Sequence, residues 1–316
     1  MNFKKLDIED RDIFQKFLGQ YEFGTYEYSF LTLYFWRKML NVEYALIDDA
    51  LIVKKYEEQK GSYFMQPIGY KEESLMKIIE KLRQIKASDA SFKNLFRDIE
   101  LPFLYKLMDL YKDDVCFCED INNFDYIYNA SDLITLKGKK FHRKRNHYNQ
   151  FVGNYSYEIK DISEPGVIND CIDFAQYWYE NRQEDDIQLE YELEGIKEVL
   201  PKYQFFGIQC MAVYVGGKIV GFTVGEKINK DMAIIHVEKG DFNYNGVYAF
   251  INKTFAEKYL SDVKYINRQE DLGHKGLRKA KMSYNPVKLE RKFIVDIKGH
   301  STLHGDIPLS KTNTYN

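Results

Sequence analysis

The chain has 316 residues, of which 45% are hydrophobic and 29% charged, and its formal net charge is -3 at pH 7. This length suits two domains of roughly 150 residues each. The near-neutral charge excludes a general attraction to nucleic acids or membranes, so any such attraction must be local. No run approaches the roughly 20 apolar residues of a membrane span, and the start lacks the apolar core of a signal peptide. We therefore expect a soluble, cytoplasmic protein.

The cysteines are few and scattered, at Cys116, Cys118, Cys171 and Cys210. No second Cys/His pair stands at a spacing typical of zinc sites. We expect reduced, buried thiols and no metal site.

The first half of the chain predicts a mixed α/β arrangement, because short β-rich runs alternate with helical apolar stripes. The expected elements are a strand at 2–7, two helical patterns within 8–39, strands at 42–48, 50–57 and 62–69, a helix at 72–86, a strand at 91–100, a helix at 101–111 and a strand at 115–120. Pro102 stands in the first turn of the helix at 101–111, where proline is favoured.

The second half repeats this order. We expect a strand at 156–163, helices at 167–182 and 188–200, a hairpin at 205–228 turning at Gly216-Gly217, a strand at 231–240, a helix at 247–259, a strand at 263–267, a helix at 272–284 and a strand at 287–296. The glycine pair is a strong hairpin signal. The shared order β-α-α-β-β-β-α-β-α-β predicts two tandem domains of one topology, at 1–130 and 131–316.

The connector between the halves carries the densest positive charge of the chain. In KGKKFHRKRNH, residues 137–147, six of the eleven residues are Lys or Arg and two are His. Two interpretations stay open: a solvated connector helix over about 137–151, or a contact for phosphates such as an RNA backbone. On the second interpretation the binding side chains are Lys139, Lys140, Arg143, Lys144 and Arg145.

Several motifs together resemble a known family. The stretch AVYVGGKIVGFTVGE, followed by a strand and a helix, resembles the central hairpin and crossover of GCN5-related acyltransferase (GNAT) domains. The segments KGKKFHRKRNHYNQF (137–151) and NRQEDLGHKGLRKAKMSYNP (267–286) resemble the signatures of the DUF2156 family, which is similar to the C-terminal catalytic domain of phosphatidylglycerol lysyltransferases.

The resemblance covers nearly the whole chain and implies an α/β fold of two tandem GNAT-like (acyl-CoA N-acyltransferase-like) domains. It also implies a relationship to enzymes that transfer amino acids from charged tRNA to lipids or to cell-wall peptides. The membrane-spanning part of the lysyltransferases has no counterpart in this sequence, which counts against a lipid acceptor.

Acyl transfer to an amine requires a group that removes the proton of the amine. On the strand at 231–240, simple alternation places Ile234, His236 and Glu238 on one face. Either His236 or Glu238 could serve as the base at the cleft end of this strand. The alternative is a surface pair at the rim of the sheet.

The loop after this strand departs from the usual coenzyme A loop. GNAT domains have an Arg/Gln-x-x-Gly-x-Gly/Ala pattern whose backbone N–H groups bind the pyrophosphate. The matching segment, EKGDFNYNGVYAF, has only Gly240 and Gly246, with Asp241 between them. This pattern argues against acetyl-CoA as the donor. It agrees with the tRNA-dependent relatives that the resemblance implies, which also depart from this loop.

The segment 267–286 combines acidic, glycine and basic residues. Steps of 100° per residue place Leu277, Ala280 and Tyr284 on an apolar arc that we expect to face the sheet. Lys281 falls at the rim of this arc. The outward side is expected to carry Lys275, Arg278, Lys279 and Met282.

We expect Arg278 or Lys281 to hold the acyl carbonyl or a phosphate, and Asn267 and Asp271 to orient the amino group of the donor. Tyr284 is a candidate acid. Gly273 and Gly276 mark a turn where a ligand can approach closely.

The alternatives are that Asp271 only caps the helix, that Lys281 extends along the surface to water, and that Tyr284 packs in the core. If the site hypothesis holds, replacing Lys281 or Asp271 by Ala abolishes donor binding and leaves the melting temperature nearly unchanged.

Three functions fit these observations. The first is a soluble transferase that moves an aminoacyl group from aminoacyl-tRNA to an amine or hydroxyl acceptor, such as a small molecule, a peptide or a lipid head group. The second is an acyl-CoA-dependent N-acyltransferase, and the third is a non-catalytic protein that binds RNA or another anion. The sequence does not indicate the oligomeric state.

Overall fold

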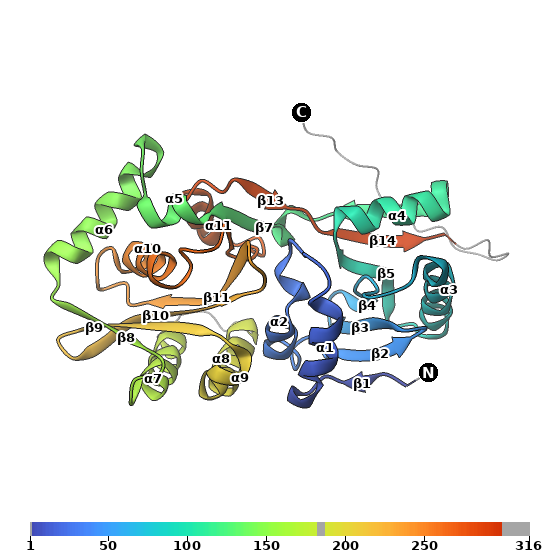
Figure 1. The fold of residues 1–316 in the computed structure, drawn as a ribbon, viewed down its shortest axis with the longest axis horizontal. Coiled ribbons are helices and arrows are strands. Elements are labelled where there is room, and N and C mark those ends of the chain that lie inside the picture. Colours follow the sequence, from blue (N-terminus) through green and yellow to red (C-terminus); the bar gives the residue numbers. More distant parts are fainter. Residues whose placement is uncertain (1, 182–186, 299–316) are drawn as a thin grey trace. The chain divides into compact units, whose positions relative to one another are not determined.

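The computed structural model describes residues 2–181 and 187–298, which form two units (Figure 1). Among the described residues, unit 1 comprises 2–5, 43–121 and 291–298, and unit 2 comprises 6–42, 122–181 and 187–290. Both units are discontinuous in sequence. They therefore do not follow the predicted boundary between residues 130 and 131, because the first helices of the chain pack in unit 2 and its last strand pairs in unit 1.

Unit 1 is a mixed sheet with two helices. Its strands are β1 (Lys4–Lys5), β2 (Glu43–Ile47), β3 (Ala50–Glu57), β4 (Gly61–Phe64), β5 (Phe92–Ile99), β6 (Val115–Glu119) and β14 (Phe293–Ile297), and its helices are α3 (Glu72–Ser88) and α4 (Leu101–Tyr111). Asp48 and Asp49 turn β2 into β3 with positive φ angles of 46° and 65°, the conformation that a two-residue hairpin turn requires. Apolar stripes of both helices pack in one core with the sheet.

Unit 2 holds the second sheet and most of the helices. Its strands are β7 (Asp125–Asn129), β8 (Tyr157–Asp161), β9 (Gln209–Val215), β10 (Lys218–Lys227), β11 (Met232–Gly240), β12 (Tyr265–Asn267) and β13 (Lys288–Glu290). Its helices are α1 (Arg11–Leu18), α2 (Phe30–Phe35), α5 (Ala130–Thr135), α6 (His142–Asn154), α7 (Val167–Glu180), α8 (Ile187–Val199), α9 (Tyr203–Phe206), α10 (Val247–Tyr259) and α11 (Lys275–Met282). Short 3₁₀ helices cover 8–10, 26–28, 112–114, 121–123, 139–141 and 200–202.

The two sheets share one strand pattern. Unit 1 runs β1-β2-β3-β4-β5-β14-β6, and unit 2, taken from its other edge, runs β8-β9-β10-β11-β12-β7-β13. The fourth and fifth strands are parallel in each sheet, β4 with β5 and β11 with β12. The sixth strand comes from a distant part of the chain in both cases. The predicted repeat of one topology is therefore present, with these two strands exchanged.

This exchange corrects two predictions. The strand expected at 287–296 is two strands, β13 in unit 2 and β14 in unit 1, with Arg291 and Lys292 between them. Strand β7 lies within about 119–153, the whole stretch that we expected to form the connector between the halves. Its five residues, DYIYN, are too few to show a period that separates a strand from a loop.

Helices cover both faces of the unit 2 sheet. Figure 1 shows α7 and α8 on one side and α10 on the other, with α6 packed against α10. The contact between α6 and α10 is aromatic, because the Phe151 ring stacks on Phe250 with centroids 4.5 Å apart. The predicted basic helix is thus α6, and it is anchored to the core through its apolar side.

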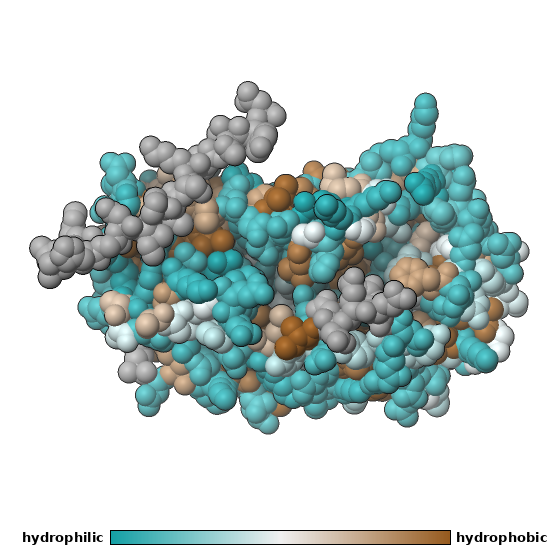
Figure 2. All heavy atoms as spheres, turned by 180° about the vertical axis from the view of Figure 1, so that it is seen from behind, coloured by the Kyte–Doolittle hydropathy of each residue, from teal (hydrophilic) through white to brown (hydrophobic). Residues whose placement is uncertain are grey.

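Hydrophilic side chains dominate the face drawn in Figure 2, and apolar side chains form separate patches there. Over the described ranges, no helix is both long enough and apolar enough to cross a membrane. The four cysteines are free thiols. Cys171 and Cys210 are buried as expected, whereas Cys118 is exposed.

Candidate functional site

A cleft opens in unit 2 where β11 and β12 stop pairing. Their parallel ladder ends at Ile234 and Asn267. Beyond it β11 continues to Gly240, while the chain after β12 turns toward α11. The resulting cleft has a volume of about 770 Å³, and its walls include Ile235, His236, Glu238, Arg268, Leu277 and Tyr284. It is large enough for a small organic ligand or a nucleotide-sized group.

A β-bulge at His236 sets which side chains face which way. The residue pairs on either side of it are Gly225–Ile235 and Val224–Val237. His236 is therefore the extra residue, and the alternation reverses after it. Glu238 lies on the face of Ile235, where Asn252 of α10 donates to its Oε2 at 3.2 Å, whereas the His236 ring lies 2.9 Å from Glu226. His236 and Glu238 both line the cleft but do not share a face, contrary to the alternation argument.

Glu238 forms a buried ion pair across the cleft wall with Arg268. The Arg268 Nη2 lies 2.9 Å from Glu238 Oε1, and the two side chains are 11% and 13% exposed. The guanidinium also lies over the rings of Tyr284 and Tyr128, 4.7 and 5.6 Å from their centroids. Although burial opposes its charged form, Glu238 and the two tyrosines raise the pKa of Arg268 above its ordinary value.

The Nη1 of Arg268 is buried without a hydrogen-bond partner among the described residues. Arg268 was not among the predicted site residues, although it stands inside the NRQED motif. One feature of the sequence could have identified Arg268. It is an arginine directly after β12, and a glutamate stands on the parallel neighbour β11.

Lys144 is the member of the basic connector that reaches the cleft. Its Nζ lies 3.9 Å from the centroid of the Tyr284 ring, and it contributes to the cleft wall. Burial and the neighbouring Arg268 lower the pKa of Lys144 to about 8.

The other predicted connector residues lie outside the cleft wall. Lys140 pairs with Asp132 at 3.2 Å, and Arg145 donates to backbone oxygens of Leu136 and Gly138. Lys139 and Arg143 are exposed. These side chains form a basic surface rather than a part of the cleft.

Lys281 is buried, with 8% of its surface exposed. Its ammonium group donates to the backbone oxygens of Arg268 at 2.6 Å and of Gln269 at 3.2 Å, and also to that of Glu270. Burial lowers the pKa of Lys281 to about 8, against the opposing effect of Glu270. Lys281 therefore holds the backbone that presents Arg268, although it also contributes to the cleft wall.

Asp271 is fully buried and serves the turn before α11. Arg278 donates to it from Nε and Nη2, both at 2.7 Å, and the N–H of Gly273 donates at 2.8 Å. Tyr126 donates a further hydrogen bond. Burial raises the pKa of Asp271, but the bonds from Arg278 and Tyr126 outweigh it and lower the pKa overall. Asp271, Gly273 and Arg278 hold each other and lie outside the cleft wall.

Asn267 is fully buried as well. It donates to Asp125 at 2.8 Å and to the backbone oxygen of Gly24 at 3.1 Å. The expected role of Asn267 and Asp271 in orienting a donor amino group does not fit these contacts, because both side chains are already bonded within the protein.

The apolar side of α11 faces the cleft rather than the sheet. Leu277 is 41% exposed, and it lines the cleft together with Gly276 and Ala280. Tyr284 is buried, packs edge-on against Tyr128 and also contributes to the cleft wall. Burial raises the pKa of Tyr284, which disfavours the tyrosinate form at neutral pH. Leu277, Ala280 and Tyr284 share one side, as predicted, but that side faces the cleft and not the sheet.

Three carboxylates gather near the end of β12. Oxygens of Glu27, Asp125 and Glu270 lie within 4.8 Å of one another, and no other described residues form such a group of potential metal ligands. Tyr26 ties this cluster together, because its hydroxyl donates to Glu270 at 2.8 Å and its N–H donates to Asp125 at 2.9 Å.

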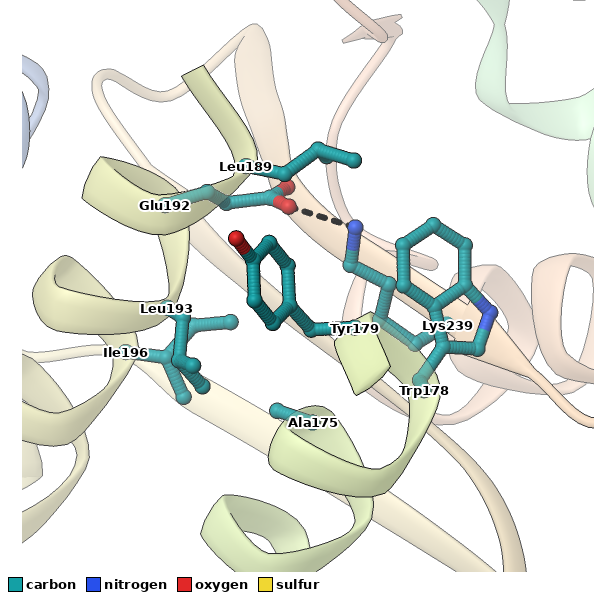
Figure 3. A pocket seen from close by; sticks show the side chains of 8 residues that line it. All are labelled: Ala175, Trp178, Tyr179, Leu189, Glu192, Leu193, Ile196 and Lys239. Carbon is teal, nitrogen blue, oxygen red and sulfur yellow. Dashed lines mark hydrogen bonds and ion pairs between the residues drawn. The ribbon is translucent and has the colours of Figure 1, made fainter. Parts of the chain in front are cut away.

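A smaller pocket adjoins the cleft between α7, α8 and β11 (Figure 3). The ammonium group of Lys239 points at the carboxylate of Glu192, 2.5 Å away, and lies over the Trp178 ring. The free volume is about 10 Å³, which holds at most a water molecule. This pocket is packing around a buried ion pair rather than a ligand site.

The loop between β11 and α10 does not fit a coenzyme A pyrophosphate. The carboxylate of Asp241 accepts the N–H of Asn243 at 2.9 Å, and the hydroxyl of Tyr155 accepts the N–H of Asn245 at 3.1 Å. A Cβ added at Gly246 would lie 2.0 Å from a backbone oxygen of α6, so α6 packs directly on this turn. The N–H groups of Asn243 and Asn245 are thus used within the protein, beside the negative charge of Asp241.

Known proteins share this architecture. A conserved protein of unknown function from Bacteroides thetaiotaomicron is 34% identical, with a TM-score of 0.84, and the match covers 94% of this chain and 100% of that one. L-PGS from Bacillus licheniformis is 16% identical with a TM-score of 0.63 over 94% of each chain. FemX is 8% identical with a TM-score of 0.60, over 94% of this chain and 98% of its own.

The two more distant structures support the fold, which is a mixed α/β arrangement of two tandem GNAT-like units. The family described as phosphatidylglycerol lysyltransferase, C-terminal, matches residues 19–296. That range includes most of both units and every residue of the cleft wall. The chain belongs to the family of phosphatidylglycerol lysyltransferase C-terminal domains.

Proposed function

We propose that the protein transfers an aminoacyl group from aminoacyl-tRNA to an amine or hydroxyl acceptor bound in the cleft of unit 2. The observation that carries the choice of donor is the loop between β11 and α10. Its N–H groups donate to Asp241 and Tyr155, and α6 packs against Gly246. An acyl-CoA donor would need those N–H groups for its pyrophosphate.

Exposed basic side chains beside the cleft supply a surface for an RNA backbone. Lys139 and Arg143 are exposed, on the same basic segment as Lys144, which lines the cleft. On α11, Lys275 and Lys279 are exposed on the helix whose apolar side also lines the cleft. Local positive charge of this kind binds phosphates despite a near-neutral chain.

Glu238 is the proposed general base. It lines the cleft and retains some exposure, whereas the His236 side chain is 3% exposed and bonded to Glu226. In the reaction the acceptor amine attacks the ester carbonyl of the aminoacyl-tRNA, Glu238 takes the proton, and the ribose oxygen leaves and regains a proton. Lys281 acts as a positioning residue, because it fixes the backbone of Arg268.

The test is transfer from tRNA charged with a mixture of labelled amino acids, in the presence of candidate amines and hydroxyl compounds. We expect label to leave the tRNA only when protein and acceptor are both present. Glu238→Gln should lower the rate at least hundredfold while tRNA binding persists.

Binding separates the alternatives. We expect uncharged tRNA, and not coenzyme A, to stabilise the protein against heat, with an affinity that falls steeply as salt rises. Stabilisation by coenzyme A without any effect of tRNA would refute the proposal in favour of an acyl-CoA donor. Binding of tRNA without transfer of any amino acid would leave an RNA-binding protein.

A further inference from the structure

Two cations of the cleft lie against one tyrosine ring. The Nζ of Lys144 and the guanidinium carbon of Arg268 are 3.9 and 4.7 Å from the centroid of Tyr284. They come from α6 and from the turn after β12, so the fold itself brings them together. Like charges this close repel each other, and burial strengthens the repulsion. The ring attracts both cations but does not neutralise them.

The charges around this pair leave an excess of positive charge. Glu238 is the carboxylate that contacts Arg268, at 2.9 Å, and it also acts electrostatically on Lys144. Arg143, on the same helix, adds a third cation near Lys144. Lys144 and Arg268 thus share one carboxylate, and the exposed Arg143 adds further positive charge near Lys144. A ligand that brings negative charge here relieves the repulsion.

The guanidinium of Arg268 is already oriented. One arm is fixed by Glu238, its face lies over Tyr284 and Tyr128, and the backbone oxygen of Arg268 is held by Lys281. The second arm, Nη1, is buried without a hydrogen-bond partner among the residues described. A buried donor left unpaired is costly, and an acceptor atom of a ligand removes that cost.

We propose that Arg268 and Lys144 form an oxyanion-binding subsite of the cleft, with Tyr284 as its floor. Its ligand is a negatively charged oxygen of the donor. This identification of the ligand rests on the proposed transfer function, whereas the subsite itself does not.

Two oxygens of an aminoacyl-tRNA have this chemistry. In the first case the amine nitrogen forms its bond to the ester carbon, and the carbonyl electron pair moves onto oxygen, where Arg268 and Lys144 stabilise it. The pair then returns as the bond to the ribose oxygen breaks, and that oxygen takes the proton given up by the amine through Glu238. In the second case the ligand is a phosphate of the tRNA end, which binds without any change of bonds.

The subsite is tested with inorganic phosphate on the full-length protein, by calorimetric titration at low salt and pH 7. We expect binding that weakens about tenfold in Lys144→Met, which keeps most of the side-chain length and removes the charge. Lys218→Met is the matched control, because Lys218 is exposed on the β9–β10 hairpin, and it should leave the affinity unchanged.

Arg268→Lys is the second variant. It keeps a cation for Glu238 but removes the second arm, so the protein should fold and phosphate affinity should again fall about tenfold. Should this variant fail to fold, Lys144→Met still decides the matter. Absence of phosphate binding to the unsubstituted protein, or equal binding by Lys144→Met and Lys218→Met, would overturn the subsite.

Kinetics with charged tRNA then identify the oxygen. If the ligand is the oxyanion of the transition state, Arg268→Lys lowers kcat and leaves the Kd of uncharged tRNA unchanged. If it is a tRNA phosphate, the variant raises that Kd and the KM. Phosphate binding that depends on Lys144, in a protein that transfers no amino acid, would support the subsite and refute the proposed function.

Discussion

The two halves of the molecule share a strand order, but they differ in structure where their two parallel strands stop pairing. In unit 1, β4 ends at Phe64, and the side chain of Gln66 accepts the N–H of Glu100, just after β5, at 3.1 Å. In unit 2, Gln269 makes a comparable bridge to the backbone oxygen of Ile235 at 3.0 Å. There, however, β11 continues to Gly240 beyond the bridge. In unit 1, β5 continues only from Phe96 to Ile99 past its last pair with β4, whereas β11 continues from Ile234 to Gly240 past its last pair with β12. The longer continuation of β11, rather than the topology, marks the position of the cleft.

The halves also differ in how they satisfy a buried cation. In unit 1, Lys55 pairs with Asp98 at 3.1 Å. Burial acts to raise the pKa of Asp98, but Lys55 and Lys292 lower it to about 2. In unit 2, Arg268 pairs with Glu238 but keeps one arm without a partner among the described residues. A compensated ion pair stabilises a fold, whereas an incompletely compensated one is suited to binding a ligand.

The largest expected effect comes from removing these two buried cations separately. Arg268→Leu and Lys55→Leu each remove the cation of one ion pair and leave the carboxylate of that pair less compensated, so each should lower the free energy of unfolding, by up to about 3–5 kcal/mol in urea denaturation. The rate of aminoacyl transfer per folded molecule should fall at least hundredfold in Arg268→Leu and stay unchanged in Lys55→Leu. Equal loss of specific activity in both variants would contradict the claim that only the ion pair of unit 2 takes part in the reaction.

Asp271→Ala tests whether the turn before α11 is structural. The sequence by itself predicts loss of donor binding with an unchanged melting temperature. The structure predicts the reverse, because Asp271 is fully buried and accepts bonds from Arg278, Gly273 and Tyr126. We expect the free energy of unfolding to fall by about 1–3 kcal/mol. A variant with native stability that no longer binds tRNA would restore the original hypothesis.

The charge of Lys144 should make the cleft of unit 2 sensitive to pH. Its pKa is lowered to about 8 by burial and by Arg268 and Arg143, against Glu238. Lys144 is therefore charged below pH 8 and loses its proton as the pH rises through that value. Phosphate affinity should fall by up to about tenfold between pH 7 and pH 9, measured by titration. Lys144→Met should show no such step, and a step of unchanged size would exclude Lys144 as its origin.

The two bridging glutamines give the smallest effect. Gln66→Ala and Gln269→Ala each remove one hydrogen bond to the backbone, and each should lower the free energy of unfolding by about 1 kcal/mol. Gln66→Ala should leave the transfer rate unchanged, while Gln269→Ala should slow transfer severalfold because it loosens the base of the cleft. Steady-state rates of the two purified variants make this comparison. A slower rate in Gln66→Ala would mean that unit 1 takes part in the reaction.

Local patterns predicted most elements of the fold. The glycine pair Gly216-Gly217 marks the hairpin of β9 and β10, and Pro102 stands in the first turn of α4, as expected. Local patterns did not predict the exchange of β7 and β14 between the two units. Nothing in VKLERKFIVD shows that its two ends pair with different sheets, because pairing partners lie far away in the sequence.

The candidate site was predicted in part. Glu238, His236 and Lys281 line the cleft together with Lys144, but three of the expected binding residues, Asn267, Asp271 and Arg278, bond within the protein instead. Arg268, which also lines the cleft, was not predicted as a site residue. Residue types and spacing show which groups can carry charge, but not which partner a given charge meets.

The sequence by itself determined the tandem α/β order, the basic segment at 137–147 and the poor fit of the 238–250 loop to coenzyme A, since each of these follows from residue type and local spacing. Tertiary structure alone decided the bulge at His236, the side of α11 that faces the cleft and the pairing of Arg268 with Glu238. These features depend on where a strand stops pairing and on which buried charges meet. Both result from the packing of distant segments, which local patterns do not encode.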